Sequence, residues 1–134
     1  MTINEIFNVN LDRAKHWHKG GIEEWSALEW AGAMCGEAGE AANVAKKILR
    51  LEHKIASINS DHMESAVSEL HGNVAERRHF TDIESANRAL AKEVADTIIY
   101  GLLVMARAGI TDPEAVIREV FNKKSEEYGF SDRL

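Results

Sequence analysis

The chain has 134 residues, of which 45% are hydrophobic, enough to build the core of one domain. Its formal net charge of −6 at pH 7 argues against general binding to nucleic acid or to an anionic membrane. No apolar run reaches the roughly 18 residues of a transmembrane helix, and the first residues lack the basic and apolar segments of a signal peptide.

The cysteine and proline content indicates the expected compartment and the expected secondary structure. The single cysteine, Cys35, excludes an internal disulfide and fits a reducing compartment, so we expect a cytoplasmic protein. The single proline, together with many alanine, glutamate and lysine residues, favours helices. We therefore expect an all-α fold with four main helices, in one domain that covers residues 1–134.

The first predicted helix begins at a capping box. Thr2 and Glu5 form the T-x-x-E pattern, and apolar residues then recur at helical spacing as far as Trp17. The glycine pair at 20–21 predicts the end of this element. The second helix is expected over about residues 22–50.

Two carboxylates lie on the apolar side of the second helix. Glu37 and Glu40 are three residues apart, so they are about 60° apart around the helix axis and can converge on one point. Their neighbours on this side are Trp30, Ala33, Met34, Ala41, Val44, Ile48 and Leu51. Burying a carboxylate is costly unless the group is paired or bound to a metal.

The third predicted helix repeats this pattern. A capping box at Thr81 and Glu84 starts it near residue 82, and it carries Glu93 and Asp96, again three residues apart among core-like neighbours. If the two acidic helices pack together, four carboxylates repel one another, and a hard cation such as Mg²⁺, Mn²⁺ or Ca²⁺ removes the repulsion. The alternative is that each pair lies on a solvated helix face, where such pairs are common.

The fourth helix and the segment between the acidic helices complete the chain. Pro113 stands at a first-turn position after Thr111 or Asp112 as cap, and the helix should end before Gly129. Residues 52–80 are expected to hold a short helix and a polar loop, inserted between the two acidic helices.

These motifs resemble those of a known enzyme family. GEAGEAANVAKK at 36–47 and KEVADTIIYGLLVMARAGI at 92–110 resemble the MazG-like all-α nucleoside triphosphate pyrophosphohydrolases, in a phage-type variant. The family motif is EExxE, a spacer, then ExxD, and Gly36 stands where the first Glu would be. The resemblance implies an antiparallel core bundle with the acids on two long helices, and the long spacer here implies the insertion at about 52–80.

The resemblance also implies an activity. Members hydrolyse nucleoside triphosphates, ribo- or deoxyribo-, to the monophosphate and pyrophosphate through a metal-activated water, with Mg²⁺ or alternatively Mn²⁺. The motif places the metal on Glu37, Glu40, Glu93 and Asp96, with Glu40 and Glu37 as catalytic residues and Glu40 as the candidate general base. A homodimer or homotetramer is expected.

Six further residues are candidates for binding the nucleotide. Lys47 lies two turns after Glu40 on nearly the same face and can reach a phosphate, although a solvated lysine is the ordinary alternative. The resemblance implies that Trp17 and Trp30 can stack on a nucleobase and that Asn122 and Lys123 can contact the nucleotide. Tyr100, one turn beyond Asp96, can hydrogen-bond to substrate. Core packing is the ordinary alternative for the three aromatic residues. The arginine that follows the asparagine in the family is not evident here.

A different class of function remains open. The chain can instead be a non-catalytic helical protein that binds a nucleotide or assembles with partners, and that keeps the acids without turnover. Gly36 and the long insertion are the features that keep this alternative open.

Overall fold

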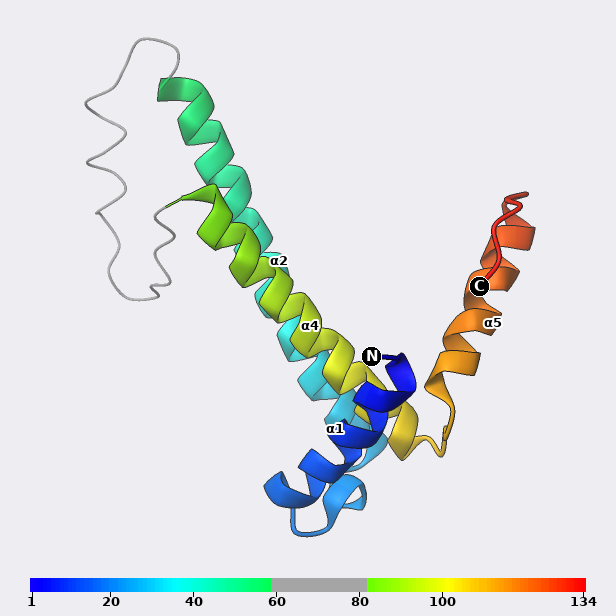
Figure 1. Cartoon of the computed structure of the whole chain (residues 1–134). Coiled ribbons are helices and arrows are strands. Elements are labelled where there is room, and N and C mark those ends of the chain that lie inside the picture. Colours follow the sequence, from blue (N-terminus) through cyan, green and yellow to red (C-terminus); the bar gives the residue numbers. More distant parts are fainter. Residues whose placement is uncertain (59–81) are drawn as a thin grey trace. The chain divides into compact units, whose positions relative to one another are not determined.

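The computed structural model describes residues 1–58 and 82–134, with side chains over 1–53 and 82–134. Within these ranges the chain forms four α-helices and one 3₁₀ turn, and no strand. In chain order they are α1 (Ile3–Trp17), η1 (Gly21–Glu23), α2 (Ala27–Ile58), α4 (Ile83–Arg107) and α5 (Pro113–Glu127) (Figure 1). The all-α prediction with four helices is confirmed for these residues. The short helix predicted within 52–80, at residues 61–70, lies outside them.

Helix α1 begins where the capping box predicted. The backbone N–H of Glu5 donates to Thr2 Oγ1 at 3.1 Å, and the N–H of Thr2 donates to Glu5 Oε2 at 2.6 Å. After the helix ends at Trp17, Gly21 adopts a φ of 60°, a conformation that glycine takes without strain.

Helix α2 begins later and ends later than the predicted span of 22–50. Its start is set by a second capping box that the sequence prediction overlooked. The N–H of Ser26 donates to Glu29 Oε2 at 2.7 Å, and the N–H of Glu29 donates to Ser26 Oγ at 3.3 Å. The helix continues to Ile58 because neither glycine nor proline interrupts it after residue 39.

The two later helices have aspartate caps. Asp82 Oδ1 accepts the N–H of Ser85 at 2.6 Å at the start of α4, whereas Thr81, the predicted cap, lies outside the described residues. Of the two candidate N-caps of α5, Thr111 and Asp112, the structure shows that Asp112 caps the helix. Its Oδ1 accepts the N–H of Ala115 at 3.0 Å. Glycines in the left-handed region, Gly109 and Gly129, follow α4 and α5, and the end of α5 before Gly129 agrees with the prediction.

Contacts divide the chain into two compact units, and the division falls inside α2 and α4. Unit 1 comprises Met1–Cys35 and Asp96–Leu134, and its core forms around Ala14, Trp30 and Leu103, none of which is exposed. Unit 2 comprises Gly36–Ala95. Its apolar core includes Val44, Ile48 and Ala86, with Leu51, Ala89 and Leu90 packed against them. The interpretation of 1–134 as one domain stays a prediction.

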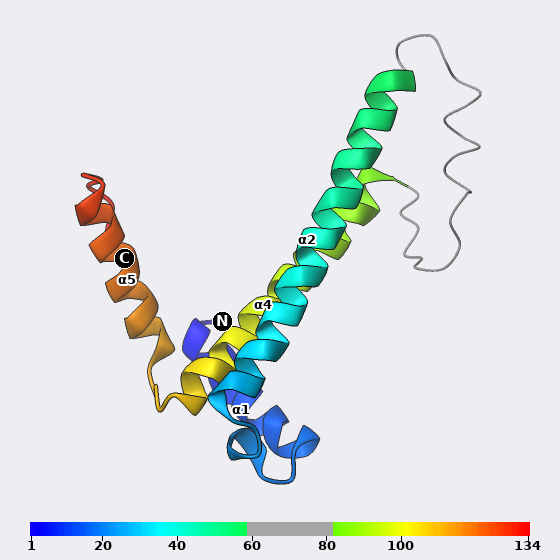
Figure 2. The same cartoon turned by 180° about the vertical axis from the view of Figure 1, so that it is seen from behind.

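Within each unit, segments of α2 and α4 supply the packing surface. Both views of the cartoon show the two helices side by side and running in opposite directions (Figures 1 and 2). In unit 1, α1 joins α4 through the side-chain amide of Asn10, whose Nδ2 donates to the carbonyl of Ile99 at 2.8 Å. This antiparallel pair carries the acidic residues.

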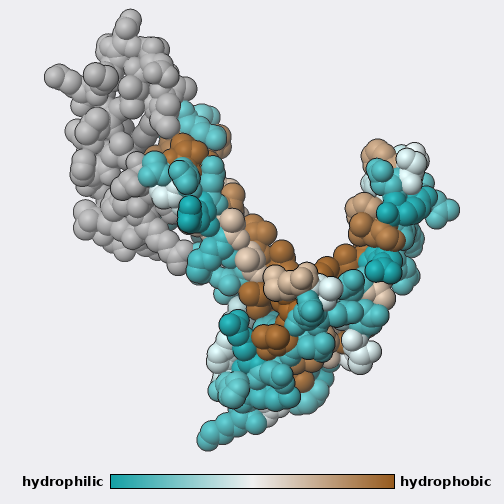
Figure 3. Space-filling model, in the orientation of Figure 1, coloured by the Kyte–Doolittle hydropathy of each residue, from teal (hydrophilic) through white to brown (hydrophobic). Residues whose placement is uncertain are grey.

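Apolar side chains also reach the surface. Figure 3 shows brown, hydrophobic patches over α4 and α5 among the teal surface. Exposed apolar side chains on these two helices include Ile98 on α4, which is 56% exposed, and Phe121 on α5, which is 41% exposed. None of the helices in the described ranges is long and apolar enough to cross a membrane.

Candidate metal centre

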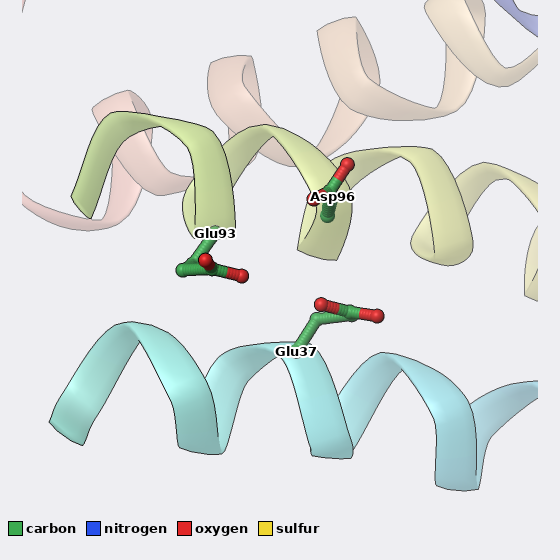
Figure 4. A group of neighbouring side chains, drawn as sticks. All are labelled: Glu37, Glu93 and Asp96. Carbon is green, nitrogen blue, oxygen red and sulfur yellow. The ribbon is translucent and has the colours of Figure 1, made fainter. Parts of the chain in front are cut away.

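Three carboxylates from the two acidic helices come together. One oxygen from each of Glu37, Glu93 and Asp96 lies within 4.8 Å of the others. Glu37 rises from α2 toward α4, Glu93 points from α4 toward α2, and Asp96 lies one turn further along α4 (Figure 4). The spacing of three residues on α4 thus brings both of its acids within reach of one acid on α2.

The group is partly withdrawn from water. Glu93 is 1% exposed, and Glu37 and Asp96 are half-buried. The ammonium of Lys92 lies 3.9 Å from Glu93 Oε1, but this lysine side chain is 61% exposed, so water screens much of its attraction. Like charges this close repel each other, and a bound cation offsets that repulsion directly.

The donor set fits a hard divalent cation. Carboxylate oxygens are the ligands that Mg²⁺, Mn²⁺ and Ca²⁺ prefer. Two oxygens on one Mg²⁺ are at most about 4.2 Å apart, since each bond is about 2.1 Å long. Oxygens within 4.8 Å of one another therefore need less than about 1 Å of movement to share an ion.

The fourth predicted ligand, Glu40, is not part of this group. Its side chain is exposed on α2. At about 100° per residue, the buried Val44 and Ile48 lie about 20° to either side of Glu37, whereas Glu40 lies about 60° away. Packing therefore turns Glu37 toward α4 and leaves Glu40 at the solvated edge. The predicted roles of Glu40 as ligand and general base stay predictions.

The predicted aromatic contacts separate into buried and exposed ones. Trp30 is fully buried beside Leu103, and its Nε1 donates to the carbonyl of Ile22 at 3.0 Å. A ring with no exposed face cannot stack on a base, so core packing describes Trp30. Tyr100 is half-buried, 6.3 Å from Trp30 between ring centroids, whereas Trp17 is 55% exposed at the end of α1.

The predicted polar contacts lie on two helices. Lys47 is half-buried on α2, and Lys123 is exposed on α5. Asn122, also on α5, binds the backbone of Leu134. Its Oδ1 accepts the N–H at 2.9 Å and its Nδ2 donates to the carbonyl at 3.4 Å. That these three side chains bind phosphate or nucleotide stays a prediction.

No protein-family model, curated protein sequence or solved structure matches the chain. The resemblance to the MazG-like enzymes therefore rests on the motifs themselves. The geometry of Glu37, Glu93 and Asp96 is an independent observation about the same residues.

Proposed function

We propose that this protein is a Mg²⁺-dependent nucleoside triphosphate pyrophosphohydrolase, a MazG-like hydrolase that releases the monophosphate and pyrophosphate. The observation that supports the proposal is the convergence of Glu37, Glu93 and Asp96. Glu37 is separated from Glu93 and Asp96 by more than 50 residues of sequence, yet the motif groups all three. Acidic residues on unrelated solvated helix faces would not be expected to converge in this way. Mn²⁺ is an alternative to Mg²⁺, because it prefers the same oxygen ligands.

In this proposal, the side chains have distinct tasks. Glu37, Glu93 and Asp96 hold the cation, and the burial of Glu93 fixes its carboxylate against α2. When bound, the cation neutralises phosphate charge and lowers the pKa of a coordinated water. Glu40, at the exposed edge of α2, accepts the proton of the attacking water as general base.

Substrate contacts are proposed for the accessible candidates. The exposed indole of Trp17 offers a face for a nucleobase. Lys47 and Lys123 offer ammonium groups for phosphate oxygens, and the amide of Asn122 offers a polar contact to the nucleotide once it leaves the backbone of Leu134. Tyr100, one turn beyond Asp96, is the remaining candidate.

We further propose a cytoplasmic homodimer or homotetramer with the MazG-like antiparallel bundle and an insertion at about 52–80. Exposed apolar side chains on α4 and α5 support self-association, because large apolar side chains at the surface are the usual material of an interface. The four that support it are Val94, Ile98, Val120 and Phe121.

One observation favours the alternative, a non-catalytic helical nucleotide-binding or assembly protein. Glu40 lies outside the carboxylate group, and Gly36 stands at the position of the motif's first acid. A chain that holds a cation with three carboxylates but lacks a functional base would bind a triphosphate without hydrolysing it.

The test is product analysis by ion-exchange chromatography. The protein is incubated with a panel of ribo- and deoxynucleoside triphosphates, with Mg²⁺ or with a chelator. Monophosphate and pyrophosphate should form with Mg²⁺ only, and the Asp96→Asn and Glu40→Ala variants should lose most of the activity. Glu52→Gln, which changes an exposed carboxylate on the same helix α2, serves as the matched control and should keep it.

A metal-binding measurement, read together with the hydrolysis assay, distinguishes the two candidate functions. If no triphosphate is hydrolysed, yet Mn²⁺ binds the wild type and not Asp96→Asn, the pyrophosphohydrolase proposal fails and the binding protein stands. If neither hydrolysis nor metal binding is seen in folded protein, both fail.

A further inference from the structure

The chain turns back along α5 after that helix ends. Gly129, with a φ of 73°, makes the turn, and the N–H of Phe130 donates to the carbonyl of Ser125 at 2.8 Å. The guanidinium of Arg133 then donates to two carbonyls of the same segment, both at 2.8 Å, so residues 130–134 form a compact strap. Both cartoon views show the strap beside α5 (Figures 1 and 2).

The strap ends on the side-chain amide of Asn122, a candidate nucleotide contact. The N–H of Leu134 donates to Asn122 Oδ1 at 2.9 Å, and Asn122 Nδ2 donates to the carbonyl of Leu134 at 3.4 Å. The first bond has an ordinary length and the second is long, so the N–H of Leu134 supplies most of the attachment. Both polar atoms of the amide are thus engaged by the strap.

An asparagine amide offers one acceptor beside one donor. That pair binds the edge of a nucleobase that carries a donor next to an acceptor, as when asparagine pairs with the edge of adenine. Leu134 presents the same complement, one N–H and one carbonyl. The strap and a nucleobase therefore cannot occupy the amide of Asn122 at the same time.

Few interactions other than these hold the end of the strap. Residues 126–134 are exposed, and Leu134 is 63% exposed, so the burial of apolar surface adds little to the attachment. Segments that depend on a few solvent-exposed hydrogen bonds open at a low cost in free energy. A ligand of ordinary affinity is sufficient to displace such a segment.

The end of the strap also borders a cavity. The cavity has a volume of about 450 Å³, within the range of small-molecule sites, and its lining includes Ile117 and Arg118 of α5 together with Leu134. Asn122 lies one turn beyond Arg118 on the same side of α5. Displacing the strap removes Leu134 from the cavity wall and opens the cavity toward the amide.

We propose that residues 130–134 are an autoinhibitory strap, which occupies the amide of Asn122 in place of the base of the nucleotide. The inference rests on the proposed function, from which the nucleotide contact of Asn122 is taken. Binding of the nucleotide then requires the strap to leave the amide. The apparent affinity for nucleotide is lowered in proportion to the fraction of molecules in which the amide is free.

Two variants at one position test the proposal. Leu134→Pro lacks the backbone N–H that binds Asn122 Oδ1, whereas the matched control Leu134→Ala keeps it. Binding is measured by calorimetry, with Mg²⁺ and the α,β-methylene analogues of ribo- and deoxynucleoside triphosphates, which are not cleaved between the α- and β-phosphates. Leu134→Pro should bind about fivefold more tightly than the wild type, the factor that corresponds to one hydrogen bond, and Leu134→Ala should match the wild type.

The amide resonance of Leu134 reports on the strap directly. In the ¹⁵N-labelled wild type, saturation with the analogue that binds most tightly should shift this resonance and speed the exchange of its proton with water. Equal affinities in the three proteins, weaker binding to Leu134→Pro, binding of none of the analogues, or an unchanged Leu134 resonance at saturation would each overturn the proposal.

The product analysis described above keeps the two proposals apart. Hydrolysis by the wild type together with equal affinities in the three proteins would sink the strap alone. Tighter binding to Leu134→Pro without hydrolysis of any triphosphate would sink the hydrolase alone.

Discussion

Replacing Glu93 by glutamine separates a metal-binding role of the carboxylate group from a structural one. Glutamine keeps the size and hydrogen-bonding oxygen of the side chain but removes its charge. At 4.8 Å, the upper limit of the oxygen separations in the group, two unit charges in an effective dielectric of about 20 repel by roughly 3 kcal/mol. The variant removes that repulsion, and it also removes the screened attraction to Lys92. Without metal, the relief of this repulsion offsets part of what the substitution removes, so Glu93→Gln is expected to cost less than about 3 kcal/mol of stability.

With metal, the wild type should gain stability that the variant does not. A cation at 100 times its dissociation constant stabilises the folded state by about 2.7 kcal/mol. For a chain of this size that corresponds to a rise of about 9 °C in the melting temperature. The wild type should show this rise in a calorimetric or fluorescence melt with saturating Mg²⁺, and Glu93→Gln should lose most of it. The matched control Glu52→Gln should behave as the wild type.

Two results would refute this reasoning. An equal rise with Mg²⁺ in the wild type and in Glu93→Gln would show that the cation binds elsewhere. A metal-free loss of more than about 3 kcal/mol in Glu93→Gln would show that the carboxylate belongs to a structural ion pair, whose disruption costs that much.

Three further predictions concern the fold. Trp30→Ala should cost about 3–5 kcal/mol in urea denaturation because it empties the core of unit 1, whereas Trp17→Ala, at an exposed position, should cost under about 1 kcal/mol; equal costs would contradict the assigned burial. Ser26→Ala should cost about 1 kcal/mol, or about 3–4 °C in a melt, by removing the cap of α2; an unchanged melt would argue against that cap. The side chain of Asn4 lowers the pKa of Asp112, so the stability of the folded state should fall as the pH drops below about 4. When the melting temperature is measured against pH, Asp112→Asn should weaken this fall at low pH. An identical fall in the variant would show that Asp112 is not its cause.

The recognised capping signals at the starts of α1 and α5 agree with the structure. The capping box at Thr2 and Glu5 placed the start of α1 correctly. The box at Ser26 and Glu29 carries the same signal, and applying the same rule would have started α2 at residue 27 instead of 22. The end of α2 was harder to predict, because α2 continues past residue 50 where no stop signal exists.

The site was predictable in part, because spacing restricts which residues share a face but does not set how a helix is rotated about its axis. The spacing of Glu93 and Asp96 within an apolar stripe sufficed to bring both to α2. Glu37 and Glu40 satisfy the same spacing, yet Val44 and Ile48 turn only Glu37 toward α4. The contact of the His18 ring with the rings of Trp25 and Trp30 was not predicted, because it depends on the path of the turn between α1 and α2, which no periodicity describes.

The measurement that tests the proposed function most directly is ³¹P NMR of the protein with a mixed pool of nucleoside triphosphates and Mg²⁺. The account predicts that monophosphate and pyrophosphate resonances grow together in equal amounts, and that neither grows in the Asp96→Asn variant or after chelation. Diphosphate with inorganic phosphate, or an unchanged spectrum from folded protein that binds Mn²⁺, would contradict it.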